Sequence, residues 1–276
     1  MIFGAHVTIS QGLIKALDWA EDIKAQSIQF FSGNPRGWQI RPYPSREAEE
    51  FKRQLKERDL GPVFLHSVYL INMGSKDKDI YDQSISSLRI SLEKAEQIKA
   101  EGVVTHIGSA QGSPKTRAME RVVRAIKEIL KTTSSNLILE NSAGAGEIIG
   151  DQIEELAEII GSIKSNRLKV CLDTCHLFAS GYNIRKRREL NRLIKQFDQQ
   201  MGLDRLVLIH LNDSMGGLGS HLDRHLNIGQ GQIGIDGFRA IVNHSALKDL
   251  PGIIETPSID QDDQNLKILR ELSNED

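Results

Sequence analysis

The chain alternates eight short apolar, β-branched runs with longer stretches of helical period. After the third run, Ile85, Leu88, Leu92 and Ala95 recur at spacings of three and four, as on the buried face of a helix. A strand followed by a helix, repeated eight times, matches the size and order of a (β/α)₈ (TIM) barrel. We therefore predict a single α/β domain, residues 1–276, built as a TIM barrel. The predicted strands are 2–7, 27–31, 63–67, 102–107, 137–141, 169–173, 205–212 and 252–256.

A doubly wound sheet is the main alternative to this architecture. No Gly-x-Gly-x-x-Gly turn follows the first strand, however, as a dinucleotide-binding sheet of that type requires. Polar residues also close most of the predicted strands, whereas a doubly wound sheet gathers them at one crevice. No Pro-, Gly- or Ser-rich linker divides the chain, so we expect one domain.

Composition excludes several classes of protein. Apolar residues make up 39% of the chain and the net charge is −2, which indicates a soluble protein with no overall attraction to nucleic acid or anionic lipid. The first residues lack a secretory signal pattern and no run reaches about 18 apolar residues, so we expect a cytoplasmic protein without membrane contact. Cys171 and Cys175 have no second cysteine pair, and we expect both to be packing thiols.

Histidines and carboxylates stand at the ends of the predicted strands, and only the second strand lacks one. A single histidine there is usually a hydrogen-bonded rim residue. In a barrel, however, all the carboxyl ends meet at one mouth, so these side chains would share a small volume. Without a metal, their carboxylates would repel one another and remain unpaired. The residues are His6, His66, His106, Glu140, Asp173 with His176, His210 and Glu255.

One further pair extends this set, and a pair already in it needs a turn to face the mouth. Asp223 and His225 are two residues apart, so in an extended segment both side chains point the same way and can hold one ion. The alternative for this pair is a solvated loop. Asp173 and His176 can both face the mouth if a turn directly follows the sixth strand, and the alternative for Asp173 is a helix N-cap.

The candidate ligands are five imidazoles and four carboxylates. A catalytic zinc uses three protein ligands plus water, so this number indicates two or three metals with bridging carboxylates. Sites rich in histidine suit zinc and other first-row metals. Three divalent ions against four carboxylates leave a local charge of about +2, which favours an anionic phosphate substrate and two-metal phosphoryl hydrolysis. The nine residues are His66, His106, Glu140, Asp173, His176, His210, Asp223, His225 and Glu255.

Several motifs run in order along nearly the whole chain. They are 66–74 (HSVYLINMG), 140–144 (ENSAG), 172–176 (LDTCH), 210–214 (HLNDS) and 223–225 (DRH). With these motifs the chain resembles the endonuclease IV family of apurinic/apyrimidinic (AP) endonucleases. That family cleaves duplex DNA 5′ to an abasic site, leaves a 3′-hydroxyl and a 5′-deoxyribose phosphate, and clears blocked 3′ ends in base excision repair.

The resemblance implies three zinc ions per chain, with some sites able to take manganese or another first-row metal. Glu140 would bridge two ions and orient the nucleophile, which makes it the implied catalytic residue. We expect a monomer that associates with the nucleoid when bound to DNA carrying abasic sites or blocked 3′ ends. The implied ligand sets are His66, His106 and Glu140; Glu140, Asp173, His210 and Glu255; and His176, Asp223 and His225.

The resemblance also implies side chains that contact DNA. Tyr69 and Leu70 follow the His66 strand and would insert between base steps as an apolar wedge, with packing beneath the loop as the alternative. Arg36 occupies the position of an inserted arginine after the second strand. The basic run 185–188 follows the sixth strand and could hold phosphates, or it could be a solvated helix start.

Three positions depart from the family pattern. Ile107 replaces a proline after the fourth-strand histidine, Met215 stands where lysine is common, and Gly33 replaces a bulkier residue before Arg36. We expect His6 to support the site rather than to bind metal. Two alternatives stay open: a xylose isomerase-like sugar isomerase or epimerase, for which the Asp223 group has no use, and a non-catalytic damage-binding barrel.

Overall fold

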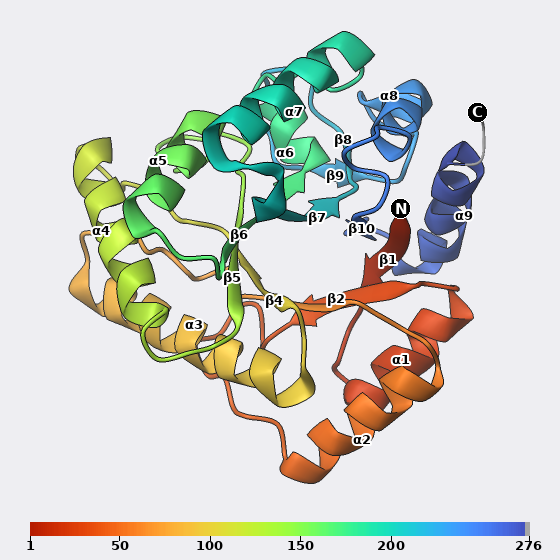
Figure 1. Ribbon diagram of the computed structural model, residues 1–276, viewed down its shortest axis with the longest axis horizontal. Helices are drawn as coiled ribbons and strands as arrows, with labels where there is room; N and C mark the ends of the chain where they lie inside the picture. Colours follow the sequence, from red (N-terminus) through yellow and green to blue (C-terminus); the bar gives the residue numbers. More distant parts are fainter. Residues whose placement is uncertain (274–276) are drawn as a thin grey trace.

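The computed structural model describes residues 1–273 as a closed parallel barrel surrounded by helices (Figure 1). Around the ring the strands run β1-β10-β7-β6-β5-β4-β3-β2, so β10 closes the barrel against β1. The predicted TIM barrel is thus confirmed, and residues 274–276 of the predicted domain lie outside the described residues. The barrel strands are β1 (Ile2–His6), β2 (Ser27–Phe31), β3 (Val63–His66), β4 (Gly102–Thr105), β5 (Asn136–Glu140), β6 (Leu168–Asp173), β7 (Leu206–His210) and β10 (Pro251–Ile254).

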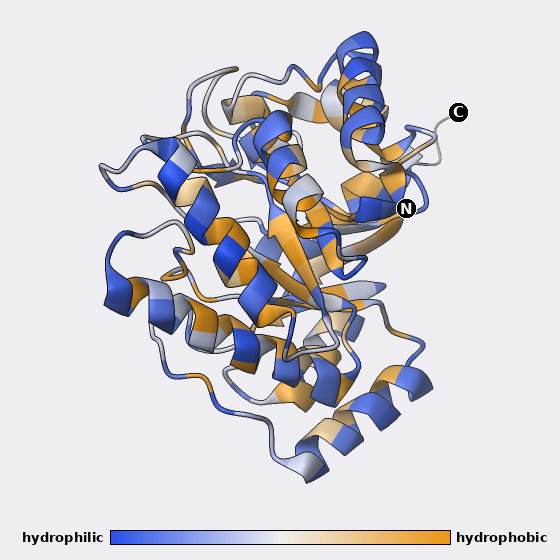
Figure 2. Cartoon of the chain, turned by 60° about the vertical axis from the view of Figure 1, so that its left-hand side comes forward, coloured by the Kyte–Doolittle hydropathy of each residue, from blue (hydrophilic) through white to orange (hydrophobic). Residues whose placement is uncertain are grey.

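The helices cover the outside of the barrel with their apolar faces turned inward, and Figure 2 shows these faces in orange beneath blue outer faces. Leu88, Leu92 and Ala95 of α3 are fully buried, as their spacing predicts. No helix within residues 1–273 combines the length and hydrophobicity needed to cross a bilayer. The helices are α1 (Leu13–Asp22), α2 (Ser45–Glu57), α3 (Lys78–Ile98), α4 (Lys115–Ile129), α5 (Ile153–Ile163), α6 (Thr174–Ala179), α7 (Arg187–Met201), α8 (Gly234–Val242) and α9 (Asp262–Ser273).

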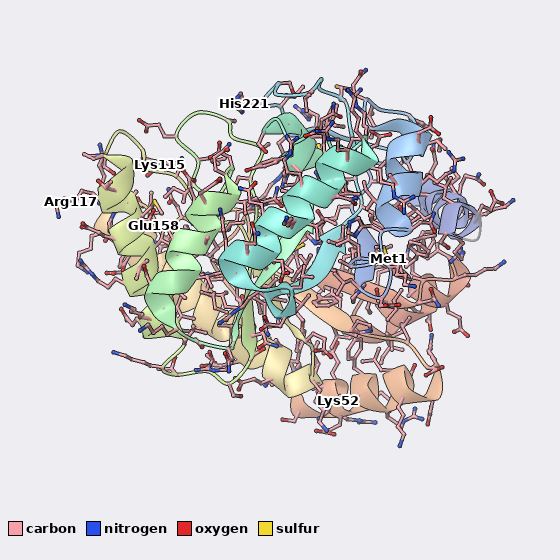
Figure 3. All side chains as sticks on the ribbon, turned by 45° about the horizontal axis from the view of Figure 1, so that its top comes forward. Met1, Lys52, Lys115, Arg117, Glu158 and His221 are labelled. Carbon is pink, nitrogen blue, oxygen red and sulfur yellow. The ribbon has the colours of Figure 1, made fainter. Side chains whose placement is uncertain are left out.

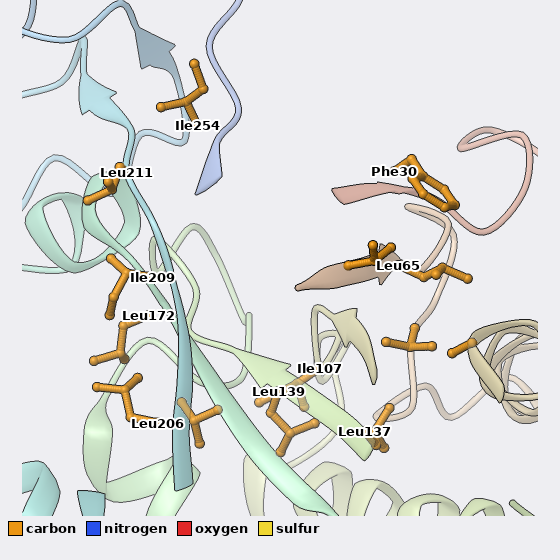
Figure 4. Close-up of a cluster of buried hydrophobic side chains, with 14 of the residues drawn as sticks. Phe30, Leu65, Ile107, Leu137, Leu139, Leu172, Leu206, Ile209, Leu211 and Ile254 are labelled. Atoms are coloured by element: carbon orange, nitrogen blue, oxygen red, sulfur yellow. The ribbon is translucent and has the colours of Figure 1, made fainter. Parts of the chain in front are cut away.

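The core has two layers. The larger one lies between strands and helices and includes Leu65, Leu137 and Ile209 (Figure 4). The smaller one consists of six buried side chains, each two positions before a predicted metal ligand that ends the strand or directly follows it. Side chains two apart in a strand share a face, so this inner layer forms the apolar floor beneath the ligands. Its members are Phe64, Val104, Ile138, Cys171, Leu208 and Ile253.

The segment after β7 differs from the sequence-based prediction. The predicted strand 205–212 is shorter, because β7 ends at His210 and the chain then enters β8 (Asp213–Ser214). β8 pairs in antiparallel fashion with β9 (His225–Leu226) outside the barrel. Asp223 lies in the loop that connects β8 to β9, two residues before the first residue of β9, His225.

Candidate metal centre

The nine predicted ligands converge at the mouth of the barrel. Most are the last residue of a strand or the first one after it, so the closed barrel brings them to one level. The other three come from α6, from the loop between β8 and β9, and from β9 itself. Their role as metal ligands remains a prediction, but the fold places all of them within reach of one another.

Within this set the ligand atoms fall into three groups. In each group every residue offers one nitrogen or oxygen, and these atoms lie within 4.8 Å of one another. The division is the one that the family resemblance implies. The groups are His66, His106 and Glu140; Glu140, Asp173, His210 and Glu255; and His176, Asp223 and His225.

Glu140 joins the first two groups because its two oxygens face different histidines. Oε2 lies 3.2 Å from Nε2 of His66 and 3.6 Å from Nε2 of His106, whereas Oε1 lies 3.0 Å from Nδ1 of His210. Burial raises the pKa of Glu140, but His106 and His210 lower it more, to well below its usual range. The carboxylate is therefore ionised and placed to bridge two cations.

Hydrogen bonds to backbone carbonyls fix the orientation of three histidines. A carbonyl oxygen only accepts, so in each case Nδ1 carries the proton and Nε2 presents its lone pair to the group. The bonds join Nδ1 of His66 to the Ser67 oxygen (2.8 Å), Nδ1 of His176 to the Asn141 oxygen (2.9 Å) and Nδ1 of His225 to the Glu255 oxygen (3.0 Å).

The third group fits a cation. The Nε2 atoms of His176 and His225 are buried and find no hydrogen-bond partner within the described chain, yet they lie 3.2 and 3.4 Å from Oδ1 of Asp223. Burial lowers the pKa of His225, but Asp173 and Asp223 raise it more, to about 9. Three lone pairs that face one another require a proton or a metal ion between them. The negative charges of Asp173 and Asp223, which favour a proton at His225, would also favour a divalent cation.

Asp173 satisfies both of its sequence-based interpretations. Its Oδ1 accepts the backbone N–H of His176 at 2.8 Å and so caps α6. Its Oδ2 accepts a hydrogen bond from the Asn212 amide at 2.6 Å and lies 3.9 Å from Nδ1 of His210. The cap turns the chain so that His176 and Oδ2 of Asp173 face the same mouth. Asn212, which orients this carboxylate, was not predicted from the sequence.

The predicted DNA-contacting residues lie beside this mouth. Tyr69 is 60% and Leu70 36% exposed, so part of each side chain is open to solvent. The Tyr69 ring packs edge-on against the Phe31 ring with centroids 5.0 Å apart. The backbone N–H of Tyr69 donates a hydrogen bond to the backbone oxygen of Pro35 at 2.9 Å. The loops after β2 and β3 are therefore joined. Exposed Arg36 stands on the first of them, and Tyr69 lines a cavity of about 540 Å³ together with several of the candidate ligands, among them His66 and His106.

The second strand does contribute to the site, contrary to the sequence-based expectation. Gln29 of β2 is fully buried and contacts both His210 and Glu255. His6 lies 3.0 Å from Oε1 of Glu255 through Nδ1, a contact suited to the supporting role expected for it. Both cysteines are buried thiols, and although Cys175 lies beside Asp173, burial raises the Cys175 pKa to about 12.

The three departures from the family pattern lie in different local surroundings. A Cβ at Gly33 would lie 3.1 Å from Cγ1 of Ile40, so a larger residue would displace that side chain. Ile107 is fully buried under Gly150, whereas Met215 is 55% exposed on the loop after β8. In the basic run, the Arg185 guanidinium packs over a phenylalanine ring, and α7 begins at Arg187.

Comparison with known proteins identifies the family. A family described as xylose isomerase-like TIM barrel matches residues 17–272. A probable endonuclease 4 from Halothermothrix orenii is 40% identical over 272 residues, which cover 98% of each chain. One from Methanoculleus marisnigri is 37% identical over 279 residues, 99% of each chain.

The chain belongs to the endonuclease IV family. The crystal structure of endonuclease IV from Thermus thermophilus superposes with a TM-score of 0.85 and 34% identity, covering 99% of this chain and 98% of that one. Membership of the endonuclease IV family confirms the resemblance drawn from the motifs. The name of the matching family also explains why the sequence left a sugar isomerase open, because the barrel is common to both.

Proposed function

We propose that this protein is a metal-dependent DNA repair endonuclease that hydrolyses the phosphodiester 5′ to an abasic site in duplex DNA. The products would be a 3′-hydroxyl and a 5′-deoxyribose phosphate, and the same site would remove blocking groups from 3′ ends. The observation that carries the proposal is the junction at Glu140, where two metal-binding groups meet beside the exposed side chains of Tyr69 and Leu70. The names of the endonuclease 4 relatives support the same activity.

Three zinc ions per chain are proposed, one in each group of ligand atoms. Bound zinc would act as a Lewis acid on the phosphate and make a water nucleophile available near neutral pH. Glu140, buried and ionised, would orient that water between His66 and His210. Asp223, whose side chain is 52% exposed, lies at the outer edge where the leaving strand would emerge.

The loops beside the mouth would select the substrate. A nucleotide must leave the base stack to reach a barrel mouth, and this costs least where the base is already missing. Tyr69 and Leu70 would fill the gap in the stack, and Arg36 would enter from the adjoining loop. Because the Tyr69 N–H is bonded to the Pro35 oxygen, both loops would approach the duplex as one unit.

The proposal is tested by incision of a duplex that carries one stable abasic analogue. We expect cleavage on its 5′ side, a 3′ end that a polymerase can extend, and loss of activity after chelation that returns with zinc. An intact duplex of the same sequence is the control, and metal analysis of the gently purified protein should find two to three zinc-like ions per chain. Equal cleavage of both duplexes, or activity that survives complete metal removal, would contradict the proposal.

A further inference from the structure

Gln29 lies at the level of the metal ligands but belongs to none of the three groups. It pairs in register with His6 of β1 and with Phe64 of β3, and its side chain is fully buried in the barrel. Ser27 of the same strand lies two positions earlier, at the level of the apolar floor. Gln29 is thus the polar side chain that β2 adds to the barrel mouth, and β2 itself lies between β1 and β3 in the ring of strands (Figure 1).

The two ends of the Gln29 amide contact two different predicted ligands. Its Nε2 donates to Oε1 of Glu255 at 2.6 Å, and its Oε1 lies 3.0 Å from Nε2 of His210. His6 completes the cluster, with Nδ1 3.0 Å from the Gln29 nitrogen and 3.0 Å from the same Glu255 oxygen. Turning the amide around would place two unprotonated oxygens 2.6 Å apart, so the chemistry of Glu255 fixes its orientation.

This orientation determines which nitrogen His210 can offer. An amide oxygen only accepts, so Nε2 of His210 carries the proton and donates it to Gln29. Nδ1 then keeps its lone pair and faces carboxylate oxygens of Glu140 at 3.0 Å, Glu255 at 3.4 Å and Asp173 at 3.9 Å. The arrangement is the reverse of that in His66, His176 and His225, which keep the proton on Nδ1.

The same amide determines which oxygen Glu255 can offer. Oε1 of Glu255 is held by Gln29 and His6, so Oε2 is the oxygen turned toward His210. A hydrogen bond to a ligand's other atom restrains the ligand's rotation and increases its basicity.

We propose that Gln29 is a positioning residue that selects Nδ1 of His210 and Oε2 of Glu255 as the donor atoms for the cation shared with Glu140 and Asp173. The inference rests on the proposed metal-binding function and adds to it a determinant of metal affinity on a strand that carries no predicted ligand. Only one of the three groups depends on Gln29, so its effect is confined to one ion.

The first test replaces the amide by a side chain of similar length. Gln29→Met removes both contacts, and Ser27→Ala is the matched control, because Ser27 is buried on the same strand and its hydroxyl has no partner within the described chain. Zinc is titrated out with a chromophoric chelator. We expect one ion to bind roughly 10- to 100-fold more weakly in Gln29→Met while the other ions and the control keep the wild-type affinity.

Unchanged affinity for every ion in folded Gln29→Met would overturn the inference. A wild-type protein that binds no zinc would instead refute the proposed function, so the two failures are distinguishable. Circular dichroism and thermal unfolding establish whether the variant folds.

A second measurement needs no variant. In zinc-loaded wild-type protein labelled with ¹⁵N-histidine, we expect the ring proton of His210 on Nε2 and those of His66, His176 and His225 on Nδ1. A His210 ring proton on Nδ1 would overturn the inference even if Gln29→Met fails to fold.

Discussion

Asp213 offers a stringent test of how the loop behind the metal centre is held. Its buried carboxylate in β8 accepts four backbone N–H groups at distances no longer than 3.0 Å, two on each oxygen. Oδ1 accepts from Ser214 at 2.8 Å and Ile233 at 2.9 Å, and Oδ2 accepts from Gly229 at 3.0 Å and Gly231 at 2.9 Å. The segment that follows His225 is thus folded around one carboxylate.

Asp213→Asn keeps the size of the side chain but replaces one oxygen by an N–H₂ group. Whichever way the amide turns, two backbone N–H groups lose their acceptor and face another donor. A hydrogen bond to a charged group contributes about 1.5–3 kcal/mol, so the loss of two should lower the free energy of unfolding by about 3–6 kcal/mol. The midpoint of thermal unfolding should fall by on the order of 10 °C.

The assay is urea unfolding of the metal-free protein, combined with hydrogen exchange of residues 226–234. We expect a lower unfolding midpoint and faster exchange in that segment. Asp236→Asn is the control, because the Asp236 side chain is 95% exposed and its loss should change the free energy of unfolding by no more than about 0.5 kcal/mol. If Asp213→Asn unfolds and exchanges like this control, the carboxylate does not organise the loop.

Three further predictions concern catalysis, recognition and stability. Glu140→Gln should keep duplex binding within a few fold but lower single-turnover incision by several orders of magnitude, whereas Glu158→Gln on the outer surface (Figure 3) should leave it unchanged. A Tyr69→Ala, Leu70→Ala double substitution should weaken binding to abasic duplex by about 1–3 kcal/mol without loss of zinc, and zinc loss would contradict the wedge. Burial raises the pKa of Asp262 to about 6, against a hydrogen bond from a neighbouring threonine that lowers it. Because the pKa is raised in the folded protein, the ionised carboxylate destabilises the fold at pH 8, whereas at pH 4 the carboxyl is protonated and does not. Asp262→Asn should therefore raise the free energy of unfolding by about 1–3 kcal/mol at pH 8 only. Equal effects at pH 4 and pH 8 in thermal unfolding would refute this.

The sequence predicts the barrel well because the information is local. Each strand is marked in the sequence by an apolar run. A predicted ligand such as His66 or Glu140 comes two residues after an inner-layer side chain such as Phe64 or Ile138. The same rule applied to β2 would have reached Gln29, two residues after Ser27, but an uncharged amide gives no signal of its own. Its function depends on contacts with residues more than 180 positions away, which no local pattern contains.

The loop after β7 was predicted less well for a related reason. One apolar residue, Leu211, follows His210, and the sequence pattern alone extends the strand through Leu211 and Asn212. In the structure, however, the Asn212 amide turns to Asp173 on the neighbouring strand, and the chain leaves the barrel to form β8. Side-chain hydrogen bonds between strands, which depend on the closed ring, decided the end of β7.

His210 keeps its lone pair on Nδ1, whereas His66, His176 and His225 keep theirs on Nε2, and the two nitrogens lie at different distances from the backbone. Nδ1 of an imidazole lies as far along the side chain as the amide oxygen of asparagine, whereas Nε2 lies as far as that of glutamine. Asparagine is therefore the substitute that keeps a donor atom in place at position 210, and glutamine is the one that does so at positions 66, 176 and 225.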